Sequence, residues 1–279
     1  MVPPPALVLG GVVSVQVGGA LAKQLFTYTG PIGVVTLRLL FAGLFLVALW
    51  RPRLKLSARS LGVVLAFGTV LGTMNFSIYL AFERIPIGMA VTIEFLGPLL
   101  VAVVGSRRWI DLLWALLAGI GVVLLTDGGA GEVDWAGVGF AALAGACWAG
   151  YILLGARLGQ HTSGGAGLAL ATVWAALLIA PFGITISGDE LLSVPLVALG
   201  AGVALLSSVV PYSLEVEALR RMPPRVFGVL MSLEPAVAAL AGLVVLGELL
   251  TATQWLAVAC VVVASFGATR SAAGTPPRD

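Results

Sequence analysis

Long runs of apolar residues, separated by short polar or turn-forming stretches, follow one another along the whole chain. A helix that crosses ~30 Å of hydrocarbon needs roughly 20 mainly apolar residues, and ten runs come close to that length. The breaks carry turn or charge signals such as Gly30-Pro31 and Gly188-Asp189. The pattern predicts an all-α membrane protein with ten transmembrane helices, over residues 6–26, 31–49, 60–82, 86–105, 110–127, 135–155, 165–186, 194–218, 223–246 and 252–270.

The composition excludes several classes of protein. Of the 279 residues, 59% are hydrophobic and 10% are charged, with a mean hydropathy of +1.08, whereas a soluble domain carries about a quarter of its residues as charged ones. A formal net charge of +2 offers no polybasic surface for nucleic acid. Two cysteines and one histidine are too few for a disulfide framework or a zinc site. We therefore expect a protein surrounded by membrane lipid, with no metal and no cofactor.

Charges in the loops predict the orientation of these helices. With the N-terminus inside, the cytoplasmic loops and tail collect Arg51, Arg53, Lys55, Arg59, Arg107, Arg108, Arg157, Arg220, Arg221, Arg225, Arg270 and Arg278. The outside loops collect Arg84 together with Glu83, Asp127, Glu132, Asp134, Asp189, Glu190 and Glu248. Because Lys and Arg stay on the cytoplasmic side of a membrane protein, both termini are predicted to be cytoplasmic.

The two halves of the chain resemble each other at a shift of 137 positions. Arg84, Pro86 and Pro98 then fall on Arg221, Pro223 and Pro235. Each half holds five predicted helices, an odd number, so the halves would lie in opposite orientations. This predicts a first five-helix repeat over residues 1–130, a second, inverted one over 131–270 and a short cytoplasmic tail over 271–279. Inverted repeats with a site at their interface are typical of transporters; a duplicated scaffold without transport is the alternative.

Two acidic residues stand out because ionisable side chains at membrane depth are costly, by ~2.5–3.5 kcal/mol each. At ~1.5 Å of rise per residue, Glu94 and Glu234 reach the midplane from opposite sides of the membrane. Pro98 and Pro235 follow them within one turn and are predicted to kink their helices. A kink can free backbone carbonyls that line a cavity, or it can simply bend a helix to fit its neighbours.

Other ionisable residues have more than one interpretation. Lys23 is close enough to a helix end to reach the interface, or it binds substrate. Arg38 is too deep for that and is predicted to form or approach an ion pair with Glu94 in at least one state. Glu215 and Glu217 lie near the inner end of the eighth helix, where at least one could neutralise Arg220 or Arg221. The polar residues inside predicted helices are Gln16, Thr73, Asn75, Tyr79, Trp148, Tyr151, Ser207, Ser208 and Tyr212.

Several motifs together resemble a known family. They are Ser14-Val-Gln16, Leu21-Ala-Lys23, Met74-Asn75, Glu94-Phe-Leu-Gly97-Pro98, Ser106-Arg107-Arg108, Ala146-Cys-Trp148-Ala, Pro211-Tyr-Ser-Leu-Glu215 and Met231-Ser-Leu-Glu234-Pro235. Nearly the whole chain is similar to the EamA branch of the drug/metabolite transporter superfamily, and within it to the bacterial inner-membrane exporters of threonine and homoserine. The family's usual Gly-Glu pair appears as Gly247-Glu248, but the first half has Gly105-Ser-Arg-Arg instead.

The resemblance implies a secondary-active exporter of small polar amino acids. A midplane carboxylate such as Glu94 can hold the substrate's ammonium when ionised and release it on gaining a proton, with Glu234 as a second proton-coupling group. The candidate substrate-binding residues are Gln16, Lys23, Asn75, Tyr79, Glu94, Trp148, Tyr151 and Tyr212. In the alternative view, Glu94 only satisfies a freed backbone group or Arg38.

Three rival functions are open at this point. The first is a multidrug or other small-metabolite exporter of the same superfamily, although only 8% of the chain is aromatic. The second is an intramembrane enzyme, but the sole His lies in a predicted loop and no His-Glu-x-x-His motif exists. The third is a passive channel, which the inverted repeat argues against. We therefore predict a transporter with no catalytic residues.

Overall fold

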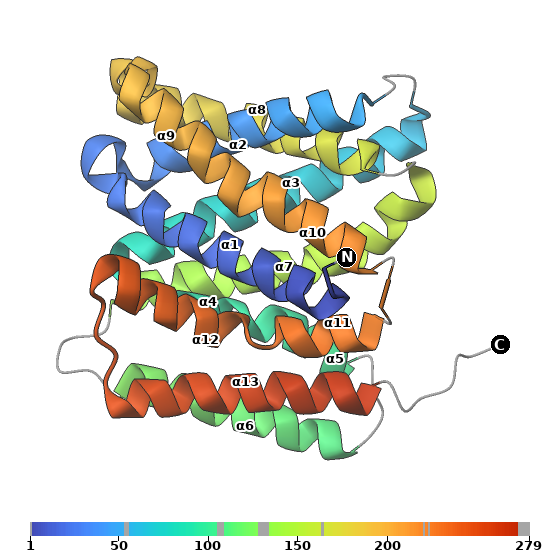
Figure 1. Cartoon of the computed structure of the whole chain (residues 1–279), viewed down its shortest axis with the longest axis vertical. Coiled ribbons are helices and arrows are strands. Elements are labelled where there is room, and N and C mark those ends of the chain that lie inside the picture. Colours follow the sequence, from blue (N-terminus) through green and yellow to red (C-terminus); the bar gives the residue numbers. More distant parts are fainter. Residues whose placement is uncertain are drawn as a thin grey trace.

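The structure is a computed structural model that describes residues 2–52, 56–104, 109–127, 134–162, 165–219, 221–222 and 224–272. These residues form a bundle of helices that run back and forth along a common direction (Figure 1). The start of the first helix and the end of the last lie at the same end of this bundle (Figure 1). Following the predicted orientation, we call this the inner end and the opposite end the outer end.

The helices of the two halves are as follows. The first half contains α1 (Pro4–Gln24), α2 (Phe26–Trp50), α3 (Ala58–Arg84), α4 (Ile87–Glu94), α5 (Leu96–Val104) and α6 (Trp109–Asp127). The second half contains α7 (Trp135–His161), α8 (Ala166–Ser187), the 3-10 helix η1 (Gly188–Leu192), α9 (Val194–Ala204), the π-helical η2 (Leu205–Val209), α10 (Val210–Leu219), α11 (Pro224–Met231), α12 (Glu234–Ala241), the π-helical η3 (Gly242–Leu246) and α13 (Ala252–Ala272).

Local signals set several helix ends. The hydroxyl of Ser57 accepts a hydrogen bond from the amide of Ser60 and so caps α3. Asp134 caps α7 in the same way, with one carboxylate oxygen accepting from Ala136 N and Gly137 N at 2.9 and 3.0 Å. Because the first amides of a helix have no partner within it, these side chains supply the missing acceptors.

The helices have the length and apolarity of membrane spans, by length and composition alone. Among the described residues, eight helices are long and apolar enough to cross a bilayer, and two shorter apolar helices cover Ile87–Val101 and Leu112–Leu124. All ten predicted segments are thus helical along most of their described length. The shorter helices correspond to the fourth and fifth predicted segments, so a count of ten spans stays a prediction.

Two helices are interrupted beside the residues singled out in the sequence. The break between α4 and α5 falls at Phe95, and the break between α11 and α12 falls at Ser232 and Leu233. Each break therefore lies within the four residues before the proline at which a kink was predicted, Pro98 or Pro235. The physical reason is that the first turn of a helix needs no amide donors, so each proline suits the start of a new half-helix.

The contacts between helices come in matching pairs. Helix α1 packs against α10 and α12, just as α7 packs against α3 and α5, and α2 packs against α9 as α8 does against α3. Two further pairs, α2 with α8 and α6 with α13, join corresponding helices of the two halves directly. An exchange of the halves would reproduce this set of contacts.

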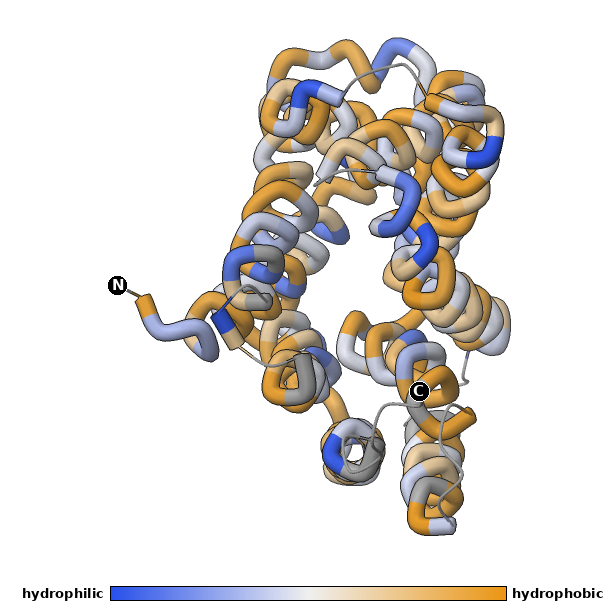
Figure 2. The backbone as a smooth tube through the Cα atoms, turned by 90° about the vertical axis from the view of Figure 1, so that its right-hand side faces the viewer, coloured by the Kyte–Doolittle hydropathy of each residue, from blue (hydrophilic) through white to orange (hydrophobic). Residues whose placement is uncertain are grey.

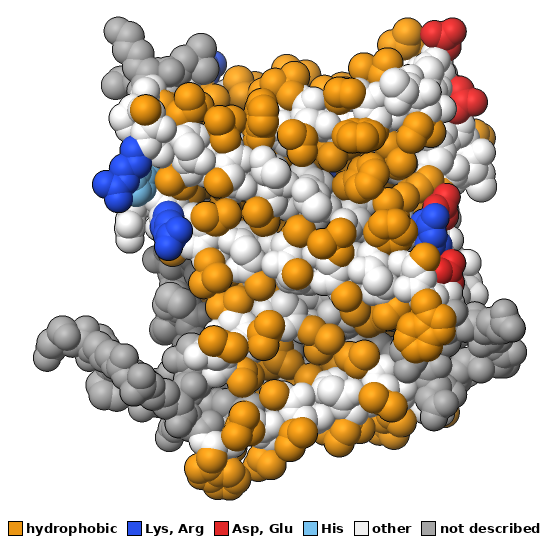
Figure 3. All heavy atoms as spheres, turned by 180° about the vertical axis from the view of Figure 1, so that it is seen from behind, with side chains coloured by type: hydrophobic (Ala, Val, Ile, Leu, Met, Phe, Trp, Pro, Cys, Tyr) orange, Lys and Arg blue, Asp and Glu red, His pale blue; other side chains and the backbone are white. Residues whose placement is uncertain are grey.

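The surface is apolar around the bundle and charged at its two ends. Viewed along the helices, hydrophobic residues occur on all sides of the bundle (Figure 2). Large exposed side chains such as Leu44, Leu112 and Val194 belong to this surface, which suits lipid better than water. In the space-filling view, Lys and Arg gather at one edge, and Asp and Glu, with some Lys or Arg, at the opposite edge (Figure 3).

That charge distribution supports the predicted orientation, although several of the residues that carried the prediction lie outside the described residues: Arg53, Lys55, Arg107, Arg108, Glu132, Arg220 and Arg278.

We expect a fluorescent protein fused after Arg270 to fluoresce and alkaline phosphatase fused there to be inactive, because both reporters would be cytoplasmic. As the control, fusions between Asp189 and Glu190, at the outer end of α8, should give the opposite result. Phosphatase activity at the C-terminal fusion would contradict both the orientation and the inverted repeat.

Candidate functional site

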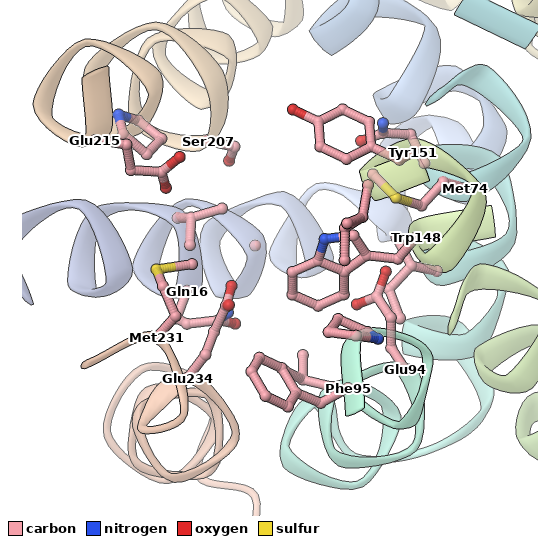
Figure 4. A pocket seen from close by; sticks show the side chains of 18 of the residues that line it. Gln16, Met74, Glu94, Phe95, Trp148, Tyr151, Ser207, Glu215, Met231 and Glu234 are labelled. Atoms are coloured by element: carbon pink, nitrogen blue, oxygen red, sulfur yellow. The ribbon is translucent and has the colours of Figure 1, made fainter. Parts of the chain in front are cut away.

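A cavity of about 380 Å³ lies between the two halves of the chain, within the size range of small-molecule sites. Its lining is mostly apolar, with a small set of charged and polar groups (Figure 4). The first half contributes Gln16, Arg38, Asn75, Tyr79, Glu94, Phe95 and Pro98, among others. The second half contributes Trp148, Tyr151, Ser207, Tyr212, Glu215, Met231, Glu234, Ser265 and Thr269, among others. Residues far apart in the sequence thus meet at the interface between the halves.

Glu94 is the last residue of α4, directly before the break at Phe95. Only 8% of its surface is exposed. Among the described residues, its carboxylate has neither a hydrogen-bond donor nor an ion-pair partner. A buried carboxylate without a partner is costly, so this group is available to a proton or to a ligand cation.

Glu234 is the first residue of α12, after the second break. Gln16 on α1 donates a hydrogen bond from Nε2 to its Oε1 at 3.0 Å, whereas its Oε2 has no partner within the described structure. Glu94 and Glu234 lie on opposite sides of the cavity, with their carboxyl groups turned toward its interior (Figure 4). Both predicted proton-coupling residues therefore lie in one cavity.

Arg38 lines the cavity from α2 and is 8% exposed. It donates from Nη1 to the hydroxyl of Tyr79 at 3.3 Å and from Nη2 to the backbone carbonyl of Ser207 at 3.1 Å. No carboxylate of the described residues lies within salt-bridge distance of Arg38, and Glu215 forms no ion pair either. The charge of Arg38 does interact electrostatically with the Glu94 carboxylate across the cavity, so the two residues approach each other without forming a salt bridge. The guanidinium donates its hydrogen bonds to neutral oxygens instead. A salt bridge between Arg38 and Glu94 in another conformation stays a prediction.

Aromatic side chains form part of the cavity wall. Phe95 and Trp148 pack edge to face, with ring centroids 5.3 Å apart and an interplanar angle of 87°. Tyr151 packs against Phe67, with ring centroids 4.6 Å apart, and this contact holds the ring of Tyr151 at the cavity surface. Trp148 and Tyr151 were expected here from the sequence. Phe95 was not, although its place beside Glu94 in the Glu-Phe-x-Gly-Pro motif was an available signal.

The remaining predicted residues differ in their placement. Asn75 lines the cavity, and its Nδ2 donates to the carbonyl of Leu71 at 2.8 Å. Tyr212 and Glu215 lie nearly one turn apart on α10 and both line the cavity. Pro98 also lines it, whereas Pro235 does not.

Lys23 does not line the cavity. Its ammonium forms an ion pair with Oε1 of Glu248 at 2.7 Å and donates to the carbonyl of Ile85 at 3.1 Å. The other oxygen of Glu248 accepts from the amide of Ile87 at 2.8 Å. The proposed role of Lys23 as a substrate ligand has no support in this geometry, because the lysine is already engaged at the outer end. The partner was missed because the sequence pattern does not show which loop reaches it, although the Gly247-Glu248 pair marked the position.

The charges of the cavity do not balance. Three carboxylates, those of Glu94, Glu215 and Glu234, face one guanidinium, that of Arg38. Glu217 is separate from this set, since it pairs with Arg221 at the inner end. The described residues hold no cluster of three His, Cys, Asp or Glu side chains suited to a metal ion. With every acid ionised, the lining would carry two excess negative charges, each of which one proton or one ligand cation can neutralise.

Comparison with known proteins places this cavity in a family. Residues 135–270 match the model of the EamA-like transporter family. The chain belongs to that family; it is a multi-pass membrane protein and a transporter, not an enzyme. The resemblance seen in the sequence motifs is thereby confirmed.

The relatives are similar along nearly their whole length. The chain is 43% identical over 269 residues to the threonine/homoserine exporter RhtA of Escherichia coli K12, covering 95% of this chain and 91% of that protein. It is 44% identical over 259 residues to RhtA of Salmonella typhimurium LT2, covering 92% of this chain and 88% of that protein. A solved crystal structure of a protein with 20% identity has a TM-score of 0.60 and covers 96% of this chain and 98% of that one, which shows the same fold.

Proposed function

We propose that the protein exports small polar amino acids of the threonine and homoserine kind across the bacterial inner membrane, in exchange for protons and by alternating access. The observation that carries this proposal is the cavity between the two halves, with a buried carboxylate beside each helix interruption. The printed function of the relatives, threonine/homoserine export, supports the substrate class. The matching helix contacts of the two halves support an inverted repeat of residues 1–130 and 131–270.

The charge imbalance of the cavity supports exchange with protons. An unpartnered carboxylate in a site shielded from water needs a compensating charge. Glu94 can take either the ammonium group of a substrate or a proton, but not both at once. Substrate and proton then compete for the same oxygens, and this competition couples outward movement of one to inward movement of the other.

Alternating access is supported by the position of the cavity along the helices. Toward the inner end, the lining includes Phe227 in the first turn of α11 and Thr269 in the last turn of α13. Toward the outer end, the bonded cluster of Lys23, Glu248 and the backbone of Ile85 and Ile87 joins α1, the start of α4 and the loop after η3. We call this cluster the outer latch. The arrangement supports a conformation closed at the outer end.

Counterflow in proteoliposomes tests the proposed function directly. Vesicles loaded with unlabelled threonine should accumulate labelled threonine transiently, and homoserine should compete with it. The rival multidrug function has some support in the aromatic side chains of the cavity wall, so the competitor panel includes hydrophobic cations. Competition by these cations without counterflow of threonine would reject amino-acid export in favour of the rival.

Replacing Glu248 by Gln should favour outward opening, because it removes the ion pair between Glu248 and Lys23. This ion pair is largely shielded from solvent, since the side chains of Lys23 and Glu248 are only 21% and 15% exposed. A hydrogen bond to a charged group is worth about 1.5–3 kcal/mol, so the outward-open population should rise roughly tenfold or more. The readout is labelling of Gly19→Cys by a membrane-impermeant thiol reagent added outside, in a background lacking Cys147 and Cys260. A Cβ at Gly19 makes only ordinary contact, 3.5 Å from the ring of Phe82.

The matched control for the latch is Glu83→Gln. Glu83 also forms an ion pair at the outer end, with Arg84, but this pair is more exposed and lies within one helix. Labelling should stay at the wild-type rate in this variant. Equal labelling of wild type, Glu83→Gln and Glu248→Gln would contradict a gating role for the latch.

A further inference from the structure

Arg38 carries a positive charge at a depth where such a charge is expensive. It lies in the middle of α2, it is 8% exposed, and it lines the cavity. A cation in that position is normally paired or functional. Its surroundings therefore indicate what the guanidinium is for.

The hydrogen-bond partners of Arg38 carry no charge. A guanidinium has five N–H donors, and the two bonds that it makes go to neutral oxygens, the hydroxyl of Tyr79 and the carbonyl of Ser207. Its Nε has no partner in the described structure. Hydrogen-bond donors therefore remain for an anion, and no carboxylate of the described residues lies within salt-bridge distance of them.

The guanidinium is held in place from two sides. Its central carbon lies 5.3 Å from the ring centroid of Tyr79, a cation–π contact. Tyr79 is itself fixed between Phe26 and Phe82, with centroids 5.7 and 5.9 Å away. On the other side, the carbonyl of Ser207 belongs to η2, where the helix widens to a π turn. The group is oriented before any ligand arrives, which lowers the cost of binding.

The same cavity holds the opposite charge. Glu94 has no partner among the described residues, and Oε2 of Glu234 has none either. A zwitterion would neutralise both kinds of group at once, since guanidinium binds carboxylate through parallel N–H donors and carboxylate binds ammonium. A ligand with an ammonium alone would leave Arg38 unsatisfied.

We propose that Arg38 binds the carboxylate of the substrate and thereby restricts the site to molecules that carry both a carboxylate and an ammonium group. This inference rests on the proposed export of amino acids. It assigns Arg38 to the ligand, in place of the protein carboxylate that the sequence suggested. Simple amines and hydrophobic cations are then rejected, because a buried guanidinium would stay without an anion.

Competition in threonine counterflow measures how much the carboxylate of the ligand contributes to binding, separately from its ammonium group. The probes are threonine, with both charged groups, and threoninol, in which an alcohol replaces the carboxylate. With wild-type protein, threonine should compete at least ten times more strongly than threoninol. In Arg38→Gln, the apparent affinity for threonine should fall at least tenfold while that for threoninol changes less than twofold, so the preference disappears. Arg157→Gln, at an exposed position on α7, is the matched control and should keep the wild-type preference.

The outcomes are distinguishable. Equal competition by threonine and threoninol in the wild type would overturn the role of Arg38 without any variant, as would an Arg38→Gln variant that keeps the preference. Equal loss of both ligands would mean that Arg38 only supports the fold. If Arg38→Gln does not fold, Arg38→Lys replaces it: it keeps the charge but loses the planar donors, and a several-fold smaller preference is expected, whereas an unchanged one overturns the proposal. Absence of threonine counterflow in the wild type would instead reject the proposed function itself.

Discussion

Glu94→Gln should abolish uphill export of threonine and remove its dependence on the pH gradient. Glutamine has nearly the same shape and can still accept a hydrogen bond, but it can neither bind ammonium as an anion nor carry a proton. A bond to a charged group is worth about 1.5–3 kcal/mol, so binding of threonine should weaken by roughly 10- to 100-fold. The measurement is threonine transport in proteoliposomes at several pH values on each side, after correct insertion has been checked.

Two further variants show whether the effect is specific to Glu94. Glu217→Gln is the matched control, because Glu217 lies on α10 at the inner end, paired with Arg221 and outside the cavity lining; it should transport normally. Glu234→Gln tests the second proton-coupling residue and should also lose pH-driven export. If Glu94→Gln still exports uphill with an unchanged pH profile, Glu94 is structural and the coupling group lies elsewhere.

Gly97→Ala should strongly destabilise the protein. A Cβ on Gly97 would overlap the backbone carbonyl of Gly145 in α7, and a Cβ on Gly145 would lie 2.7 Å from the carbonyl oxygen of Glu94. Backbone atoms on both sides cannot move aside as a flexible side chain would. Overpacking of this kind costs about 3 kcal/mol or more, which corresponds to a fall in Tm of roughly 6–12 °C for a chain of this size.

The comparison uses Gly119→Ala, in the middle of α6, where a Cβ meets open space. That substitution should leave Tm unchanged or raise it slightly, because alanine favours a helix over glycine by up to about 1 kcal/mol. Thermal unfolding of the detergent-purified proteins, followed by size-exclusion chromatography, gives both values. Equal Tm for Gly97→Ala and Gly119→Ala would show that α5 and α7 can separate without cost.

The sequence predicted the helices well because a bilayer demands long apolar segments, and the demand is met locally. It also identified Glu94 and Glu234, since a carboxylate at membrane depth is costly wherever the fold places it. Both lie in the cavity together with Gln16 and Trp148. These predictions depended on depth and residue type, which the sequence contains.

What the sequence could not supply was the choice of partner. Arg38 was expected to form or approach an ion pair with Glu94. Its hydrogen bonds go instead to Tyr79 and the carbonyl of Ser207, and that choice depends on how α2, α3 and η2 pack. The sequence left two roles open for Lys23, an anchor at the membrane interface or a substrate ligand. Its actual partner, Glu248, lies 225 positions away in the sequence. Partners of this kind are set by tertiary geometry, which periodicity does not record.

The outer latch also breaks the symmetry between the two halves. At the shift of 137 positions, Lys23 corresponds to Gln160, Ile87 to Pro224 and Glu248 to Asp111. Proline has no N–H and glutamine has no charge, so these positions cannot rebuild the same cluster at the inner end. Under the proposed alternating access, we therefore expect the two access states to differ in energy, with the resting population biased toward the one that faces the cytoplasm, the side from which an exporter takes its cargo.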